Sequence, residues 1–271
     1  MNLLKLPTYE EQWRLPLLTL GASSPKTDEA HSVDGFESVI LYLQPTKRLC
    51  QWRTNGCARV CLNTSGRGAM RATQRARARR TFLLRADRTR FIGKAAREIH
   101  LAKCRAQRKG KALTVRINGT SDDLALADSI AAGFSSESLA GRVRFYDYSK
   151  CPDHRFYGPD FLVSRVHSIS EDSRSSEVLD FIARKISVAI VAEGATHEER
   201  AETALLSLGI GTGLVPLCVD GTRHDLTFLH EPGSIIVLEP KGKAKKDETG
   251  FVRRRRHVAG AMLRGGATMM H

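Results

Sequence analysis

The sequence predicts an α/β protein whose strands pair mainly in parallel, as in an open doubly wound sheet or a full or partial parallel βα barrel. The first observation is a series of short apolar segments that begin near residues 38, 112, 142, 160, 186, 214 and 234. The second is that helix-like or linking segments separate most of them, which favours right-handed βαβ crossovers. No G-x-G-x-x-G motif opens a helix after the first segment, so a dinucleotide-binding sheet is disfavoured.

The chain divides into a long folded part and two ends of different character. With 271 residues, 41% of them hydrophobic, it can bury a full core as one large α/β domain or two small ones. We predict an irregular N-terminal arm over residues 1–38, a barrel-like α/β domain over 39–252 and a basic flexible tail over 253–271. A serine–proline stretch is typical of a loop in the arm, and four consecutive arginines begin the tail.

The N-terminal sequence has the pattern of neither a signal peptide nor a membrane span. Its apolar residues are interrupted by Pro7, Glu10, Glu11, Arg14 and Pro16, and no basic segment precedes a continuous apolar run. No window approaches the roughly 20 apolar residues that a transmembrane helix needs. We therefore expect no membrane partner and a cytoplasmic location, where thiols stay reduced and can bind a metal.

Three of the six cysteines lie close together, directly after the first predicted strand at residues 38–46. Cys50, Cys57 and Cys61 form a C-x6-C-x3-C pattern, and a glycine-rich turn follows them. Thiolates are soft, strongly donating ligands that suit zinc or an iron–sulfur cluster. Three ligands are one short of a closed tetrahedral zinc site, but they suit a cluster that leaves one iron open.

Other interpretations of these cysteines stay open at this point. A structural zinc site could take a distant fourth ligand, for which Cys151 is a candidate. Cysteine is also often a small buried hydrophobic residue. A disulfide with a spare thiol is weaker, because nothing marks the chain as secreted. We rank a metal or cluster site first.

Polar side chains gather where the predicted strands end, which is where α/β folds place their functional sites. The candidates for binding a cofactor are Asn118, Ser121, Asp122, Ser164 and Arg165. Ser121 or Asp122 could instead cap the helix that follows. Arg165 lies inside an apolar strand, where a buried guanidinium needs a partner.

A basic helical region follows the cysteines between Met70 and Gly110. Apolar residues at roughly helical spacing predict two helices, broken near Asp87. Only Asp87 and Glu98 oppose a large excess of arginine and lysine, in a chain whose net charge is +14. One-sided charge favours a polyanionic partner, nucleic acid first, although a solvated helix face is the ordinary alternative. The residues that we predict to contact nucleic acid are Arg71, Arg75, Arg79 and Arg80.

Several short motifs resemble the phage protein family called gene product 88. They are C-x6-C-x3-C followed by L-N-T-S-G-R-G, then V-R-I-N-G-T-S-D, F-Y-D-Y-S-K and a late G-F-V-R. The match runs in order from about Gly21 to Arg253, and its cysteine–glycine block is the most specific part. The resemblance implies a phage-encoded protein that works in the cytoplasm of the host cell.

A more distant resemblance is to phage-encoded proteins of the radical S-adenosylmethionine type. Those proteins carry cysteines at nearly this spacing after the first strand, although the usual pattern is C-x3-C-x2-C. They also carry an N-S-M-S-D-like turn after the second strand and a T-K-R-P-like turn after the third, where this chain reads Asn118-GTSD and Tyr148-SKCP. The resemblance implies a βα barrel that holds a four-iron, four-sulfur (4Fe-4S) cluster through Cys50, Cys57 and Cys61. It also implies S-adenosylmethionine on the open iron, with zinc as the alternative metal.

Three functional hypotheses follow from these features. In the first, the protein is an iron–sulfur, radical S-adenosylmethionine-like enzyme of unknown substrate that could act on nucleic acid. Asn118, Ser121 and Asp122 would then hydrogen-bond the amino or ribose groups of the cofactor, and Arg165 would bind its carboxylate. In the second, it is a non-enzymatic nucleic-acid-binding protein with a structural zinc site. In the third, it is a phage accessory protein that binds a host partner.

Overall fold

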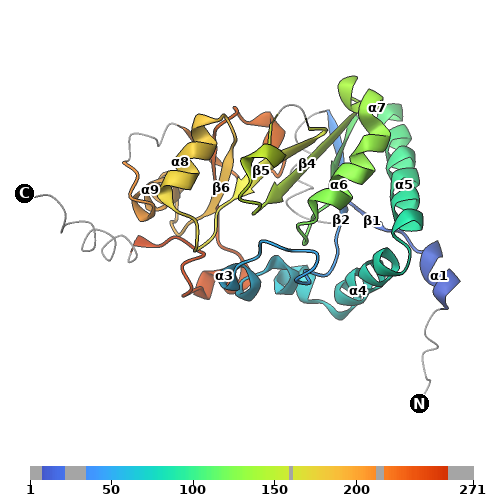
Figure 1. Ribbon diagram of the computed structural model, residues 1–271, viewed down its shortest axis with the longest axis horizontal. Helices are drawn as coiled ribbons and strands as arrows, with labels where there is room; N and C mark the ends of the chain where they lie inside the picture. Colours follow the sequence, from blue (N-terminus) through green and yellow to red (C-terminus); the bar gives the residue numbers. More distant parts are fainter. Residues whose placement is uncertain (1–7, 22–34, 159–160, 212–216, 256–271) are drawn as a thin grey trace, which may run out of the picture.

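The computed structural model describes residues 8–21, 35–158, 161–211 and 217–255, which form a mixed α/β structure (Figure 1). The described strands build one eight-stranded sheet in the order β1-β2-β3-β4-β5-β6-β8-β7. Every neighbouring pair is parallel except β1 with β2. The strands are β1 Leu18–Leu20, β2 Phe36–Leu41, β3 Ala112–Arg116, β4 Val143–Ser149, β5 Val163–Ser168, β6 Val188–Val191, β7 Cys218–Asp220 and β8 Ile235–Leu238.

Helices connect most of the parallel strands, as the alternating pattern predicts. The α-helices are α1 Tyr9–Arg14, α3 Asn55–Arg59, α4 Arg71–Ala86, α5 Arg88–Arg108, α6 Leu124–Ala131, α7 Ser135–Leu139, α8 Ser175–Ala183 and α9 His197–Ser207. Short 3-10 turns that matter below are η2 Leu62–Thr64, η3 Gly66–Ala69, η7 Thr227–Leu229 and η8 Gly242–Lys246. In the part of the chain that the structure describes, no helix is long and apolar enough to cross a membrane.

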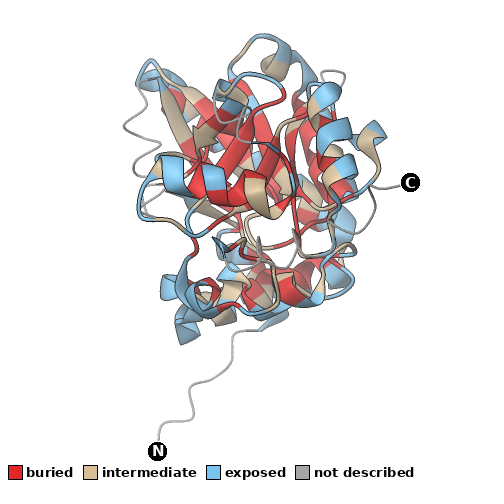
Figure 2. Ribbon diagram, turned by 90° about the vertical axis from the view of Figure 1, so that its left-hand side faces the viewer, coloured by how far each residue is buried: buried red, intermediate tan, exposed pale blue. Residues whose placement is uncertain are grey.

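The main core lies on one face of the sheet, between the strands and the crossover helices. Figure 2 shows buried strands enclosed by partly exposed helices. The register places Val39 beside Val115 and Phe145 beside Val163, and these side chains pack against α4, α5 and α6. The same face continues through Val188 to the core under α8 and α9. The crossover helices therefore cover one face, and strands β2 to β6 follow one another in sequence order.

The opposite face of the sheet carries smaller clusters and several polar groups. Tyr146 packs there against Leu226 and Phe228, which come from the segment around η7. Ser38 and Thr114 form a buried hydrogen bond of 2.6 Å between neighbouring strands on this face. The sequence also allowed an open doubly wound sheet, which carries helices on both faces. The described helices cover only one face, which differs from that architecture.

The N-terminal arm is more ordered than the sequence indicates. Helix α1 and strand β1 both fall within residues 1–38, and β2 begins at Phe36. Glu98 of α5 accepts hydrogen bonds from the backbone N–H groups of Leu17 and Leu18, at 2.9–3.1 Å. Leu17 is fully buried. These contacts come from residues far along the chain, so the local sequence, broken by prolines, gives no sign of them.

The start of the predicted basic tail, at residue 253, is bound to the folded part of the chain. The backbone N–H of Arg253 donates to the Val191 carbonyl at 2.8 Å, and its own carbonyl accepts from Glu193 N at 2.9 Å. Arg254 is buried and pairs with the Glu193 carboxylate. Arg255 pairs with Glu202 at 3.6 Å. The first three arginines of the four-arginine run thus belong to the folded part, and residues 256–271 lie outside the described residues.

The predicted break between two basic helices is confirmed at Asp87. Asp87 lies between α4 and α5 in an extended conformation, and its Oδ1 accepts a hydrogen bond from Arg90 N at 2.9 Å. This is the standard arrangement of an N-cap, which satisfies a backbone N–H that has no partner within the helix. The cap fixes where the second, longer helix starts.

Replacing Asp87 with Ala should lower the free energy of unfolding by about 1 kcal/mol, because the first turn of α5 loses its cap. Urea denaturation of the two proteins measures the difference. Asp87→Ser is the matched control, since its hydroxyl can still accept the hydrogen bond. Equal losses in both variants would contradict the capping role.

Candidate metal centre

The cysteine loop lies at the carboxyl edge of the sheet, where several strand ends meet. Cys50 pairs with Asp122 in an isolated parallel bridge, and the Leu49 carbonyl accepts a hydrogen bond from Asp122 N at 2.7 Å. Asp122 Oδ2 in turn accepts from Lys150 N at 2.9 Å. The loops after β2, β3 and β4 are therefore joined directly. Figure 1 shows α3 beneath this edge, beside the C-terminal segment.

The three clustered thiols lie near one another in a partly dry environment. Burial is the main cause that raises the pKa of Cys50 to about 12, and the Asp122 carboxylate and the other two thiols add to it. Burial also raises the pKa of Cys57, although the Lys150 ammonium acts in the opposite direction. Cys61 is half-buried. A metal would bind these groups only as thiolates, so its binding would displace their protons.

The other cysteines do not join this group. All six cysteines are free, so the disulfide interpretation is not borne out. Cys151, the candidate for a fourth ligand, is buried in the apolar core under α8 and α9, and its Sγ approaches the Asp153 carbonyl at 3.9 Å. Cys104 lies on α5, with its Sγ 3.6 Å from His100 Nε2.

Glu171, from the loop after β5, fixes the short helix that carries Cys57. Its Oε1 accepts from Gly56 N at 2.5 Å and its Oε2 from Thr54 Oγ1 at 2.8 Å. Thr54 Oγ1 also caps α3 by accepting from Cys57 N at 3.2 Å. A carboxylate near the N-terminus of a helix is favourable, because the free N–H groups there carry partial positive charge. Glu171 thereby orients the backbone at Cys57.

Asn118 organises the turn after β3 with its own hydrogen bonds. Its Nδ2 donates to Asp147 Oδ2 at 3.0 Å and to the Asp123 carbonyl at 3.2 Å. Its Oδ1 accepts from Ser121 Oγ at 2.8 Å and from Asp123 N at 3.0 Å. An amide side chain has two donor and two acceptor positions, so all of them are used. Asn118 shapes the site rather than presenting a free group to a ligand.

Asp122 places a buried carboxylate beside the thiols, and burial raises its pKa, although hydrogen bonds from the Lys150 backbone and the Ser149 side chain act in the opposite direction. The residue is 92% buried, and Oδ1 has no hydrogen-bond partner among the described residues, whereas Oδ2 is used. The helix N-cap that the sequence offered to Ser121 or Asp122 belongs to Asp123, whose Oδ1 accepts from Leu126 N at 2.9 Å. A buried carboxylate oxygen without a partner is costly, which marks it as a place for a cation or a donor.

Ser164 and Arg165 lie on opposite faces of the sheet. Ser164 is in register with Tyr146 and so faces the side without crossover helices. The Arg165 guanidinium has no exposed surface, pairs with Asp128 of α6 and donates to the Phe156 carbonyl at 3.0 Å. Its two terminal nitrogens are thus engaged on the helix-covered side, while Nε has no hydrogen-bond partner among the described residues, and the two predicted cofactor residues do not converge.

Two residues at this edge were not among the predicted site residues. Lys150 donates from Nζ to Ser168 Oγ at 2.9 Å and lies over the Phe251 ring, 5.3 Å from its centre. Glu171, described above, is the second. Lys150 directly follows β4 and Glu171 lies in the loop after β5, so the rule that selected Asn118 and Asp122 could have selected them. Their partners, however, come from distant segments.

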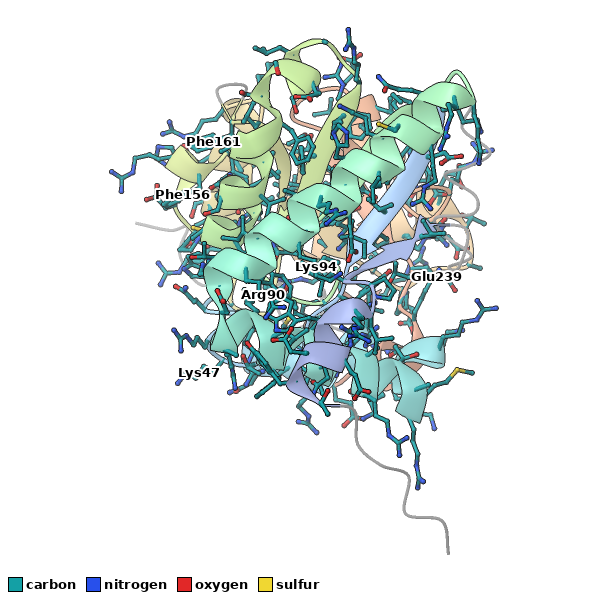
Figure 3. All side chains as sticks on the ribbon, turned by 90° about the vertical axis from the view of Figure 1, so that its right-hand side faces the viewer. Lys47, Arg90, Lys94, Phe156, Phe161 and Glu239 are labelled. Atoms are coloured by element: carbon teal, nitrogen blue, oxygen red, sulfur yellow. The ribbon has the colours of Figure 1, made fainter. Side chains whose placement is uncertain are left out.

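The four arginines predicted to bind nucleic acid fall into two pairs. Arg71 and Arg75 are exposed on α4. Arg79 donates to the carbonyls of Gln12, Leu15 and Pro16, at 2.5–3.3 Å, and the buried Arg80 donates to Thr19 Oγ1 at 3.2 Å. The second pair thus holds the N-terminal arm against α4. On α5, Arg90 also binds the arm, through Glu10, whereas Lys94 pairs with Glu98 of the same helix (Figure 3).

The comparison with protein families matched most of the chain, residues 18–255, to the family described as gene product 88. This chain belongs to that family. The match includes all eight described strands of the sheet and ends at Arg255, which is also the last described residue. Neither the curated proteins nor the solved structures gave a match.

In this gene product 88 protein, the motifs that carry the family resemblance meet in space. The cysteine loop, the Asn118–Asp122 turn and Lys150 form the carboxyl edge. The late G-F-V-R motif adds Phe251 over Lys150 and Arg253, whose guanidinium donates to the Ser170 carbonyl at 2.6 Å. Segments that are distant in sequence thus build one site.

The metal predictions themselves remain predictions. Among the described residues, no group of three or more His, Cys, Asp or Glu side chains is arranged to hold one metal ion. A zinc ion would need its ligands about 2.0–2.3 Å from a single centre. A four-iron cluster instead binds each thiolate at a different iron, so it takes sulfurs that lie farther apart.

Gly56→Ala should destabilise the protein by about 1–3 kcal/mol, because an added Cβ would meet the Glu171 carboxyl carbon at 2.6 Å as well as Thr249 Oγ1. Gly93→Ala is the matched control, because a Cβ there meets no atom within 4 Å. As Gly93 lies inside α5, its replacement should stabilise by about 0.5–1 kcal/mol. Chemical denaturation measures both, and a shift of the same sign in the two variants would contradict the packing of Glu171 against Gly56.

His167 should make the protein less stable in acid. Burial, more than any other cause, lowers the pKa of His167 from 6.5 to about 4. Its Nδ1 lies 3.2 Å from the Tyr157 hydroxyl, and its ring stacks on Phe181. The unfolded chain takes up the proton first, so stability is complete above pH 6.5 and is lost as the pH falls towards 4, by about 3 kcal/mol. Denaturation of wild type and His167→Gln across this range should give converging stabilities at low pH; parallel profiles would refute the assignment.

Proposed function

We propose that Cys50, Cys57 and Cys61 hold a four-iron, four-sulfur cluster with one open iron, in a radical S-adenosylmethionine-like enzyme whose substrate is unknown. The observation that carries this proposal is the convergence of three thiols with a buried, unpartnered carboxylate oxygen at one edge of the sheet. A multivalent cationic centre is the group that offsets the cost of ionising thiols beside a carboxylate.

The donor set fits a cluster better than a single ion. All three side chains are thiols, which iron–sulfur clusters take as ligands, and the fourth cysteine near the site is turned into the apolar core. A closed zinc site needs four ligands around one ion, and the described residues offer no such group. The missing fourth ligand leaves one iron open for another molecule.

The residues around the thiols fit the amino-acid part of S-adenosylmethionine. Asp122 Oδ1 is a free acceptor for an ammonium group. Lys150 is a half-buried cation near Cys57 that suits a carboxylate, and Ser168 and Phe251 hold it in place. We propose Lys150 for the role first given to Arg165, because the Arg165 guanidinium is already paired with Asp128.

The architecture fits the same function. We propose that the sheet curves into a partial barrel, since strands β2 to β6 are consecutive neighbours and their crossover helices lie on one face. In βα barrels the catalytic groups lie at the carboxyl ends of the strands, as the cysteine loop does here. When bound, a reduced cluster of this kind supplies one electron for the cleavage of S-adenosylmethionine. The protein's own residues hold and orient the cofactor and limit its contact with water.

Cys57→Ala should abolish the cluster, whereas Cys104→Ala, on the outer helix α5, should leave iron and sulfide content unchanged. Both contents are measured on protein purified and reconstituted without oxygen.

Asp122→Asn should keep the iron but weaken S-adenosylmethionine binding about tenfold, because it removes an ionic acceptor. With a strong reductant, the wild type should release 5′-deoxyadenosine, detected by mass spectrometry.

The alternative is a structural zinc site in a protein without enzymatic activity. One tightly held zinc and no iron in protein prepared without oxygen would support that alternative and overturn the cluster. A fully loaded cluster that binds no S-adenosylmethionine would keep the metal assignment but remove the radical mechanism.

A further inference from the structure

Two basic segments that are distant in sequence border the cysteine loop. The first runs from the cysteines into α4, and no Asp or Glu occurs between Glu37 and Asp87. The second is Lys241 with the turn η8 that follows it, which carries Lys243, Lys245 and Lys246.

The fold brings the two segments together. Ala244 of η8 packs in one buried cluster with Val60, which directly follows α3. Gly242 lies so close to Ser65 that an added Cβ would overlap the Ser65 side chain. Figure 1 shows the C-terminal segment beside α3 at the carboxyl edge of the sheet. The lysines of η8 and the arginines near the cysteines therefore share one side of the molecule.

Several basic side chains here point into solvent and have no acidic partner. We call them the basic rim; none of them forms an ion pair within the described ranges. The basic rim consists of Arg59, Arg71, Arg75, Lys241, Lys243, Lys245 and Lys246, all exposed. Other basic residues of the same region differ, since Arg77, Arg79 and Arg80 are held by contacts inside the protein.

We propose that the basic rim binds the phosphate backbone of a nucleic acid and leads the strand past the cysteine loop. An array of seven cations, spread over three elements without an opposing pair, matches a row of phosphates. Helix α4 adds to the positive charge of this array. Its N-terminus carries partial positive charge on free N–H groups, and it has no side-chain cap and no acidic residue in the first turn. The inference goes beyond the proposed metal centre and does not depend on it.

A nucleic acid fits this surface better than an acidic membrane does. Peripheral membrane binding uses one amphipathic helix with a broad apolar face beside its basic face. Here the cations come from a short helix, the start of α4 and a 3-10 turn. Their exposed apolar neighbours, Leu62 and Met70, are separate side chains rather than a helix face. Contacts of this kind hold the backbone of a strand and do not read its sequence.

Neutralising pairs of cations tests the surface. The variants are Lys243→Gln with Lys245→Gln in η8, Arg71→Gln with Arg75→Gln in α4, and all four together. The matched control is Arg105→Gln with Arg108→Gln, exposed near the carboxyl end of α5 and equal in charge change. Binding of fluorescent single-stranded and duplex oligonucleotides of mixed sequence is followed by anisotropy over a series of salt concentrations. Iron and zinc contents of the same samples report separately on the metal centre.

The wild type should bind at low salt, and its affinity should fall steeply as salt rises. In a plot of log binding constant against log salt concentration, each lost phosphate contact reduces the slope by about one. Each rim pair should therefore reduce the slope by about two, and the fourfold variant should reduce it by about four. The control should keep the wild-type slope. Absence of binding at low salt would overturn the proposal. So would equal losses in rim and control variants, an unaffected η8 pair, or binding to anionic phosphatidylserine vesicles without binding to either oligonucleotide.

Discussion

The backbone pairing between Cys50 and Asp122 is the interaction on which the site depends. It fastens the cysteine loop to the turn after β3, and the Asp122 carboxylate then reaches Lys150 N after β4. Glu171 connects the loop after β5 to the cysteine loop, because it accepts a hydrogen bond from the backbone of α3. Arg253 connects the C-terminal segment to the same edge by donating hydrogen bonds to the carbonyls of Val191 and Ser170. Each link uses a hydrogen bond to a backbone group, so the position of the thiols is set by the sheet and not by the loop alone.

The sequence was informative where one residue or one local pattern decides the structure. Asp87 ends one helix and caps the next, and the apolar segments became strands close to their predicted positions. It was less informative about the arm. Its order comes from Glu98 and Arg79, which bind backbone groups of residues 12–18 across the molecule. Backbone partners of this kind leave no mark on the local sequence, because any residue supplies an N–H or a carbonyl.

The same reasoning explains the site residues. Residue type and strand end predict a polar edge, and Asp122 presents a free oxygen there. Neighbouring residues of a strand point to opposite faces, so Ser164 and Arg165 could not both reach one ligand. Which of them faces the helices depends on the register of β4 with β5. The polarity of Asn118 predicts a contact with a ligand, but its donors and acceptors are used by Asp147, Asp123 and Ser121.

Burial and charge act in opposite directions across this edge of the protein. Burial keeps the Cys50 and Cys57 thiols protonated, and Asp122 and Glu171 place negative charge near them. Ionising all of these groups together is unfavourable without a cation, so binding of the proposed metal would release protons and should become tighter as the pH rises. The basic residues outside the loop lie too near the solvent to replace such a centre, because water and salt screen exposed charges. The proposed metal inside the loop and the proposed polyanion along its rim would therefore be complementary, each balancing charge of the opposite sign.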